Sequence, residues 1–488
     1  MRKPGTPVHP PALDFAAGLR SLESEKSGHE LAVTGSLPDW LSGTLLRNGP
    51  ACFEAGARTF EHWFDGQAML HRFAIESGGR VTYANRYIDT PAARAVCAQG
   101  RIAYMEFATD PCRSLFARFF TPFFTPRIRR AAGTSSNPNV NIARFGERLV
   151  ALTETPVPVE FDAETLATVG IVDYQDELHG QITSAHPHQD RATGDLVNYL
   201  THYSRRSEYR VYRQAAGGTQ RELVGCHRVA APSYMHSFGI TGRYLVLAEF
   251  PLVVNPLKLL LSGRPFIDNF RWEPQRGTRF VVFDLRHGGV RGVYEGPACF
   301  AFHHINAWEE GEDIVLDLAA YRDATVIDAF RLDRLRAGGA VPQAYPTRFR
   351  ISLADSRVTA ERLSSESLEL PRISYEAHNG LPYRYAYGIG ARSDQRDSFA
   401  NQLVKLDTVE RTNRLWHSPG TYPGEPVFVP APGATAEDDG VVLSIVLDAG
   451  PHEPSSFLLV LDARDFTELA RARAPHAIPF GFHGVFAR

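Results

Sequence analysis

Cysteine is scarce in this chain of 488 residues, which has five cysteines and no CxxC pair. An odd number of scattered thiols indicates neither a disulfide framework nor a cysteine zinc site. A reducing, cytoplasmic environment therefore fits best. The five are Cys52, Cys97, Cys112, Cys226 and Cys299.

Long apolar runs and a positive charge excess are missing as well. No stretch approaches the ~20 apolar residues that cross a bilayer, and residues 1–19 lack the apolar centre of a secretory signal. The formal net charge of −3 gives no footprint for nucleic acid. There is no GxGxxG fingerprint for a flavin or nicotinamide. The sequence predicts a protein that is soluble or lies at a membrane surface.

What the chain does contain is enough apolar sequence for a large core, with 43% hydrophobic and 22% charged residues. No low-complexity linker divides it. We predict a polar arm over residues 1–30, stiffened by prolines, and a single domain over residues 31–488.

Short β-strands dominate from about residue 31, and several end in Asp before a turn. An Asp at a strand end can bond the backbone of its own turn. With two further hairpins, at 73–79 and 209–218, this gives seven candidate hairpins at spacings typical of propeller blades of about 40–50 residues. A β-sandwich array would leave many exposed edges, so we predict an all-β, seven-bladed propeller. The Asp positions are Asp162, Asp284, Asp333, Asp407 and Asp462.

Helical patterns are expected only in two insertions, at about 110–130 and 250–275. Their apolar parts, 113–126 and 251–262, are richer in Leu and Phe than surface insertions usually are. One interpretation is a buried cap over the propeller. The other is an exposed apolar patch that dips into one membrane leaflet.

Four of the eighteen histidines lie among small, aromatic or apolar residues. They are His186, His236, His303 and His483, and the first three follow one another at roughly blade spacing. Inner propeller strands line a common axis, so one histidine from each of four blades would converge there. Imidazole suits iron, zinc, copper and nickel, and the absence of thiolates argues against a structural zinc. From position alone, His188 and His304 are rivals to their neighbours.

Several motifs, taken together and in this order, resemble the carotenoid cleavage oxygenases from about residue 31 to the end. The resemblance implies a seven-bladed propeller with a helical cap and one Fe(II) per chain held by His186, His236, His303 and His483. It selects His303 over His304 by its position three residues before Asn306. The motifs are Arg47-Asn-Gly-Pro50, His62-Trp-Phe-Asp-Gly66, Ala185-His-Pro187, Met235-His-Ser-Phe238, Phe302-His-His-Ile-Asn-Ala307 and Pro479-Phe-Gly-Phe-His483.

The same resemblance implies three glutamates bonded to the ligand imidazoles: Glu154, Glu369 and Glu425. A carboxylate that accepts the far N–H of an imidazole fixes its tautomer and direction. Thr153 matches a family position that crowds one open iron site. Without the resemblance, each glutamate would be interpreted as a surface residue.

The reaction that the resemblance implies inserts both atoms of O₂ across one C=C bond of a carotenoid or apocarotenoid and gives two carbonyl products. Local details resemble the animal-type branch, with β-carotene 15,15′-oxygenases and retinoid isomerases, so we expect central cleavage to retinal. The arginine-rich composition looks microbial, which makes the isomerase less expected. Segments 114–126 and 251–262 are expected to contact a membrane surface peripherally. The details are Asp110-Pro-Cys-Arg113 with Phe116, Leu152-Thr-Glu-Thr155, His186-Pro-His188 and Tyr385-Ala-Tyr-Gly388.

Three alternatives stay open. Eccentric cleavage of a carotenoid is one. Stilbene cleavage is another, but that branch looks as if it holds the substrate phenol with a lysine before the first ligand, and residues 27–257 contain none. The third is a non-catalytic propeller scaffold with structural histidines, which the iron content would separate from an enzyme.

Overall fold

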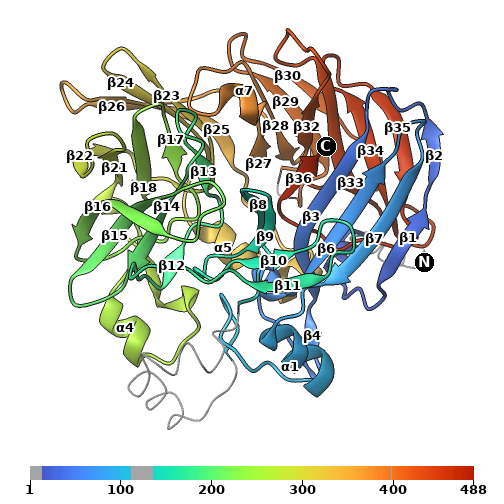
Figure 1. Cartoon of the computed structure of the whole chain (residues 1–488), viewed down its shortest axis with the longest axis horizontal. Coiled ribbons are helices and arrows are strands. Elements are labelled where there is room, and N and C mark those ends of the chain that lie inside the picture. The colour runs from blue at the N-terminus through green and yellow to red at the C-terminus, as the bar shows by residue number, and fades with distance from the viewer. Residues whose placement is uncertain (1–13, 111–135, 397) are drawn as a thin grey trace, which may run out of the picture.

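The chain folds into seven antiparallel sheets of four to six strands, arranged in a ring (Figure 1). The computed structural model describes residues 14–110, 136–396 and 398–488. The predicted seven-bladed β-propeller is confirmed. Strand lengths and burial within the sheets follow from the alternating and fully apolar runs of the sequence.

In blades 2 to 4 the strands follow one another in the sequence from the axis outward, whereas blade 1 takes its innermost strand from the C-terminus and its outermost strand from the N-terminal segment. Blade 1 contains β36 (Gly484–Ala487), β3 (Gly43–Cys52), β6 (Gln67–Ile75), β7 (Val81–Tyr87) and β1 (Lys26–Glu30). Blade 2 contains β8 (Asn141–Phe145), β9 (Arg148–Leu152), β10 (Val159–Phe161) and β11 (Thr168–Ile171). Blade 3 contains β12 (Ile182–Thr183) with β13 (His188–Gln189), β14 (Leu196–His202), β15 (Ser207–Gln214) and β16 (Arg221–Val229). Blade 4 contains β17 (Gly239–Ile240), β18 (Tyr244–Glu249), β21 (Thr278–Asp284) and β22 (Val290–Gly296).

The last three blades complete the ring in chain order. Blade 5 contains β23 (Phe300–Glu310), β24 (Asp313–Tyr321), β25 (Tyr345–Ser352) and β26 (Val358–Arg362). Blade 6 contains β27 (Glu369–Arg372), β28 (Tyr385–Gly390), β29 (Gln402–Asp407) and β30 (Thr412–Trp416). Blade 7 contains β31 (Thr421–Pro423) with β32 (Val427–Pro430), β33 (Gly440–Asp448), β34 (Ser455–Asp462), β35 (Glu468–Arg473) and β2 (Ala32–Gly35).

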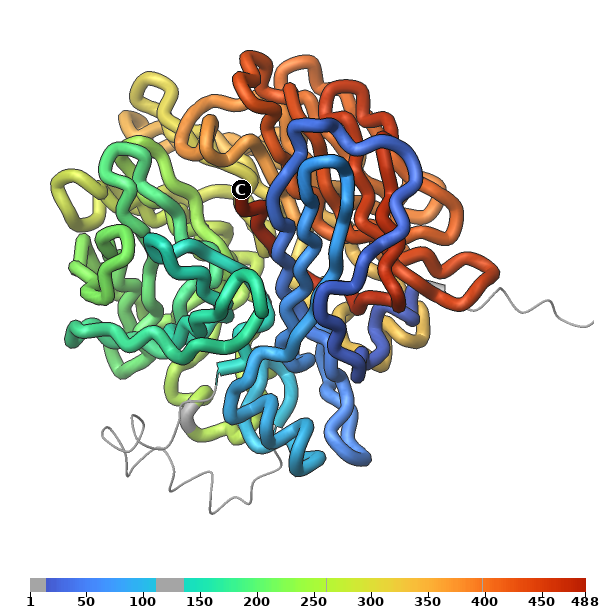
Figure 2. The backbone as a smooth tube through the Cα atoms, turned by 45° about the vertical axis from the view of Figure 1, so that its right-hand side comes forward, coloured from blue at the N-terminus to red at the C-terminus, as the bar shows by residue number. Residues whose placement is uncertain are grey.

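Both ends of the chain close the ring by pairing with distant strands. The last strand, β36, pairs with β3 in blade 1, and β2 pairs with β35 at the outer edge of blade 7. Figure 2 shows the red C-terminal segment running into the interior beside the blue first hairpin. The innermost strand of blade 1 therefore comes from the C-terminus, which places the residues before it at the axis.

Four of the five predicted Asp turns are confirmed. Asp162, Asp284, Asp407 and Asp462 each accept backbone N–H groups two and three residues further on. The prediction at Asp333 is wrong, because this residue lies in α6 (Leu332–Arg336). Leu332 and Leu335, three residues apart, are buried there on one helix face.

Helices are not confined to the two predicted insertions. Others are α1 (Pro91–Gln99), which begins at the N-cap Thr90, α5 (Thr325–Ala329), α6 and α7 (Tyr375–His378). Short 3-10 turns are η1 (Asp14–Leu19), η2 (Trp63–Asp65), η3 (Ile267–Asn269) and η4 (Pro274–Arg276). Small hairpins pair β4 (Glu54–Ala55) with β5 (Arg58–Thr59) and β19 (Leu252–Val254) with β20 (Phe270–Trp272).

The two apolar insertions have different outcomes. Segment 113–126 lies outside the described residues. In segment 251–262 only the second half is helical, as α4 (Pro256–Leu261), whereas Leu252–Val254 is a buried strand. Figure 1 places α1, β4 and α4 at one end of the ring. Within the described part of the chain, no helix combines the length and apolar character needed to cross a bilayer.

The described half of the predicted arm, residues 14–30, packs on the propeller. Phe15 is buried and stacks on Phe399, with ring centroids 5.3 Å apart. The strand β1 extends blade 1 by pairing with β7. Residues from both ends of the chain therefore stabilise the first and last blades.

Candidate metal centre

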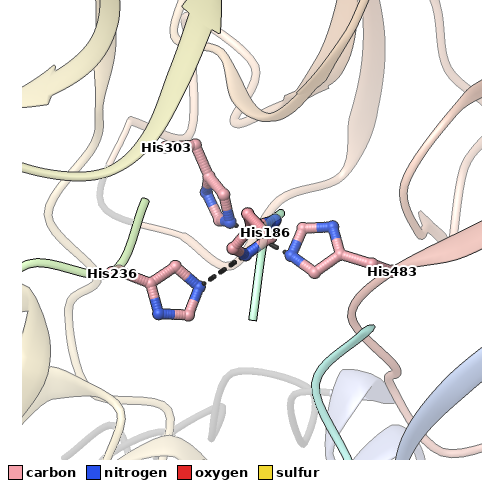
Figure 3. Close-up of side chains that lie close together, drawn as sticks. All are labelled: His186, His236, His303 and His483. Atoms are coloured by element: carbon pink, nitrogen blue, oxygen red, sulfur yellow. Dashed lines mark hydrogen bonds between the residues drawn. The ribbon is translucent and has the colours of Figure 1, made fainter. Parts of the chain in front are cut away.

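The four predicted histidines meet at the propeller axis (Figure 3). His186 lies between β12 and β13, His236 just before β17, His303 in β23 and His483 just before β36. Each is therefore on or beside the innermost strand of a different blade. One ring nitrogen from each lies within 4.8 Å of those of the others.

Three carboxylates lie behind three of these rings. Glu154 accepts the Nδ1–H of His236 at 2.7 Å, Glu369 that of His303 at 2.6 Å and Glu425 that of His483 at 2.7 Å. No carboxylate of the described residues bonds the remaining ring, His186. The three Nδ1 protons fix the tautomer, so the Nε2 lone pairs point at the axis.

Every blade supplies one member of this set. The histidines come from blades 3, 4, 5 and 1, Glu154 follows β9 in blade 2, Glu369 begins β27 in blade 6, and Glu425 lies between β31 and β32 in blade 7. A propeller brings one inner position from each blade to a common axis. Residues far apart in the sequence thus become one site.

The contacts between the rings test whether a metal ion fits. The Nε2 atoms of His303 and His483 are 3.1 Å apart, and because both rings donate Nδ1–H to glutamate, two lone pairs face each other. Only a proton or a cation between them makes this arrangement favourable. Burial, and then the neighbouring imidazoles, lower the pKa of His483 and of His186 well below the usual value. A proton is therefore disfavoured, and the donor set fits a metal ion.

Glu425 has a partner that the sequence did not indicate. The guanidinium of Arg47 forms an ion pair with Glu425 and donates to the carbonyl of Phe482 at 2.7 Å. Both side chains are buried. Glu154 instead accepts from the Tyr234 hydroxyl at 2.8 Å, and Glu369 from the Leu370 backbone N–H at 2.5 Å. Arg47 thus links the carboxylate and the backbone that orient His483.

The rival histidines lie outside the cluster. His188 contacts the Tyr375 hydroxyl through Nδ1 at 2.9 Å and the Phe238 carbonyl through Nε2 at 3.1 Å. His304 contacts the Ser237 hydroxyl through Nδ1 at 2.8 Å. Thr153 is half-buried beside Glu154, and among the described residues no hydrogen bond joins it to the four histidines.

Two cavities border the cluster and share His303 and His483 in their linings. An apolar cavity is lined by His236, His303 and His483 together with aromatic rings such as Trp63 and Phe302. A larger cavity is lined by His186, His303 and His483 and by both polar and apolar residues. The histidines therefore border an apolar space, the kind of lining that binds apolar organic molecules.

Comparisons with known proteins agree with this arrangement. The family model described as "Retinal pigment epithelial membrane protein" matches residues 19–488. A mitochondrial carotenoid-cleaving dioxygenase of Mustela putorius furo is 37% identical, covering 96% of this chain and 95% of the relative. A mutant of the Synechocystis apocarotenoid oxygenase has a TM-score of 0.86 at 28% identity, covering 97% of this chain and 98% of that one. The cobalt-substituted form of that oxygenase has a TM-score of 0.85 at 29% identity, with the same coverage.

Proposed function

Because the chain belongs to the carotenoid cleavage oxygenase family, we propose that it cleaves a C=C bond of a carotenoid or apocarotenoid with O₂. The proposed products are two carbonyl compounds, and central 15,15′ cleavage to retinal is the leading reaction. The observation that carries the proposal is the convergence of four imidazoles beside an apolar cavity. Eccentric cleavage is the alternative within the same chemistry.

We propose His186, His236, His303 and His483 as the ligands of one Fe(II). The three carboxylates Glu154, Glu369 and Glu425 hold the Nδ1 protons, so three of the rings keep their lone pairs directed at the axis. Ferrous iron bound by these neutral ligands would supply the activation of O₂. Imidazole alone does not distinguish iron from copper, nickel or zinc, so the choice of iron rests on the family.

The cavity walls would hold the polyene. Trp63 packs against Phe482 with centroids 4.7 Å apart, and Phe64 packs against Phe302 at 5.6 Å. These rings form an apolar surface next to His483 and His303. A stiff, apolar substrate held there would present one double bond to the metal. Because binding already fixes its position, the reaction step itself loses little translational and rotational entropy. We propose that Thr153 limits the free space at one open coordination position.

The experiment is incubation of the iron-loaded protein with β-carotene, apocarotenals and resveratrol under ¹⁸O₂. We expect aldehydes from the carotenoids that carry one ¹⁸O each, and retinal if the central bond is cleaved. Cleavage of resveratrol alone would support stilbene chemistry. A stable protein that purifies without iron and cleaves none of them would support the scaffold.

We also propose peripheral contact with a membrane, from which a lipid-dissolved substrate enters. Leu257 and Leu261 on α4 are 55% and 60% exposed, and α4 lies at the same end of the ring as α1 (Figure 1). Segment 114–126, the other half of the proposal, lies outside the described residues. In a liposome flotation assay we expect the protein to float with the lipid and a Leu257→Ser/Leu261→Ser variant to float less. Equal behaviour of both proteins, or no binding, would contradict it.

A further inference from the structure

At one place the apolar cavity and a pocket at the protein surface share a single residue, Phe399. Of the residues that the structure describes, no other lines both spaces. The surface pocket is bordered by exposed residues such as Gly339 and Asp394. On the cavity side, the ring of Phe399 packs against Trp63 with centroids 5.7 Å apart. Phe399 therefore forms a wall between the cavity and the surface.

A second ring, Phe15, backs this wall from the outside. It stacks on Phe399 with centroids 5.3 Å apart and 11° between the ring planes. Phe15 lines the surface pocket but not the cavity, so Phe399 lies between Phe15 and Trp63. Because Phe15 belongs to η1, the N-terminal segment supplies the outer layer of the wall.

Close contacts hold η1 against the wall. The Gly18 carbonyl accepts from the Phe480 N–H at 2.8 Å, and the Leu19 carbonyl accepts from Arg336 at 2.7 Å. A Cβ atom at Gly18 would overlap the Phe480 ring. That ring in turn packs on Phe399, with centroids 4.6 Å apart. The absence of a side chain at Gly18 therefore lets η1 sit directly on the rings that form the wall.

We propose that η1, through Phe15, keeps the apolar cavity closed at this wall, which excludes water from the cavity and limits the length of the polyene that it accepts. Without the Phe15 ring, Phe399 has space on its outer side into which it can turn, because stacked rings in a packed interior hold each other in place. The limit on length rests on the proposed function, whereas the exclusion of water does not.

Acrylamide, a quencher dissolved in water, reports whether the wall is closed, because Trp63 lines the cavity and is only 5% exposed. We expect the Stern–Volmer constant for tryptophan fluorescence to be larger in Phe15→Ala than in the wild type. The increase should disappear when Trp63→Phe is added. Phe161→Ala is the matched control, since Phe161 is also buried, in β10, and lines neither space. It should be quenched as the wild type is.

The variant Gly18→Ala disturbs the wall without removing any of its rings. Either η1 or the Phe480 ring must move to admit the added methyl group, and both lie against Phe399. We expect stronger quenching in this variant too. Gly170→Ala is its matched control, because nothing lies within 4 Å of a Cβ atom at Gly170, in β11. If Phe15→Ala does not fold, this second pair of variants still decides the question.

The limit on length is tested with the iron-loaded protein and two substrates of different chain length, β-apo-12′-carotenal and the longer β-apo-8′-carotenal. We expect the ratio of kcat/KM, longer over shorter, to rise about tenfold from the wild type to Phe15→Ala. Burial of about two further carbon atoms in apolar surroundings contributes roughly this factor. Phe161→Ala should keep the wild-type ratio.

The outcomes separate this inference from the proposed function. Unchanged quenching in Phe15→Ala and Gly18→Ala would overturn the inference and leave the proposed function intact. An unchanged length ratio in a variant whose quenching rises would do the same. Stronger quenching in both variants of a protein that cleaves no carotenoid would overturn the proposed function and support the closure of the cavity by η1.

Discussion

Arg47 and Glu425 form an ion pair in which both side chains are buried, 4% and 0% exposed. Removing one partner of a buried pair costs about 3–5 kcal/mol; without Arg47, Glu425 keeps only the longer ion pair with Arg372, at 3.7 Å. We therefore expect Arg47→Met to lower the free energy of unfolding by that order. The double variant Arg47→Met/Glu425→Gln should recover part of the loss, because neither charge is then left alone. Chemical denaturation of the wild type, Arg47→Met, Glu425→Gln and the double variant gives the free energies of unfolding for a double-mutant cycle.

The cycle has a clear contrary result. If the double variant is less stable than the wild type by the sum of the two single losses, the two side chains act independently, and Arg47 does not act through Glu425. Arg210→Met is a suitable control, since Arg210 pairs with Glu208 in a less buried position.

Glu154 offers a separate test of the carboxylates. Glu154→Gln keeps an oxygen that can accept the Nδ1–H of His236 and removes the charge. We expect the affinity for the metal to fall about 10- to 100-fold, measured by competition with a chelator. Glu177→Gln, at a side chain that is 95% exposed, should bind the metal as the wild type does. Equal affinity in both variants would mean that Glu154 does not support the ligand.

Among single residues, the sequence predicted the histidines better than their partners. His186, His236, His303 and His483 stood out because apolar and small neighbours indicate burial, and the family motifs selected them from their rivals. The glutamates came from the resemblance alone. Arg47 was part of a motif, but its partner Glu425 is 378 residues away, and no local pattern connects them.

Among the secondary-structure elements, several strands end in an Asp whose carboxylate accepts backbone N–H groups of the following turn. Asp284, at the end of β21, accepts the N–H groups of Arg286 and His287 and an ion pair from Arg243 at 2.8 Å. Burial alone would raise the pKa of Asp284, but the hydrogen bonds from Arg243 and His287 outweigh it and hold the pKa below its usual value.

This shift has a defined sign in the pH dependence of stability. Because the folded pKa lies below the unfolded one, of about 3.9, Asp284 stabilises the fold above that pH, and the contribution is lost as the pH falls further. We expect Asp284→Asn to lose less stability than the wild type between pH 5 and about pH 2. Denaturation midpoints at several pH values measure it.

The matched control is Asp39→Asn, at an exposed position. It should show the same pH profile as the wild type. A profile of Asp284→Asn that is parallel to the wild type over the whole acid range would contradict the role of this turn. Asp162 and Asp407 also have lowered pKa values. Asp284→Asn should therefore remove only part of the loss of stability that the wild type shows at acid pH.

Element types were predictable where the cause is local. An Asp followed by its turn is a short-range signal, so four of five positions were correct. Asp333 failed because Phe330-Arg-Leu-Asp333 alternates like a strand for too few residues to exclude a helix. The run 251–262 was taken as one helix, but its first half pairs with β20, which lies outside the run in sequence.

For the whole molecule, ring closure and the metal centre share one segment. His483 immediately precedes β36, which closes blade 1 through pairs such as Leu46 with Val485. A ligand that binds only the folded state stabilises it. We expect removal of the metal to lower the melting temperature and to speed hydrogen exchange at Val485 and Phe486 more than in β33 and β34. If removal of the metal speeds exchange at Val485 and Phe486 no more than in β33 and β34, ring closure does not depend on the metal centre.

Six of the seven hairpins predicted from the sequence are turns within blades, and only the one at Asp333 is not, because it lies in α6; the closure of the ring could not be predicted. Hairpin spacing is local, whereas the pairing of β2 with β35 and of β36 with β3 joins opposite ends of the chain. The arm over residues 1–30 was interpreted as polar and separate for the same reason. Its β1 pairs with β7, a contact that no periodicity within the arm indicates.

The most direct test of the four-histidine iron site is iron X-ray absorption on the purified, iron-loaded protein, with the metal content measured on the same sample. We expect one iron per chain and a first shell that contains four imidazole nitrogens, reduced to three in His236→Ala. A protein that stays folded but binds no stoichiometric metal, or an iron shell unchanged in His236→Ala, would contradict it.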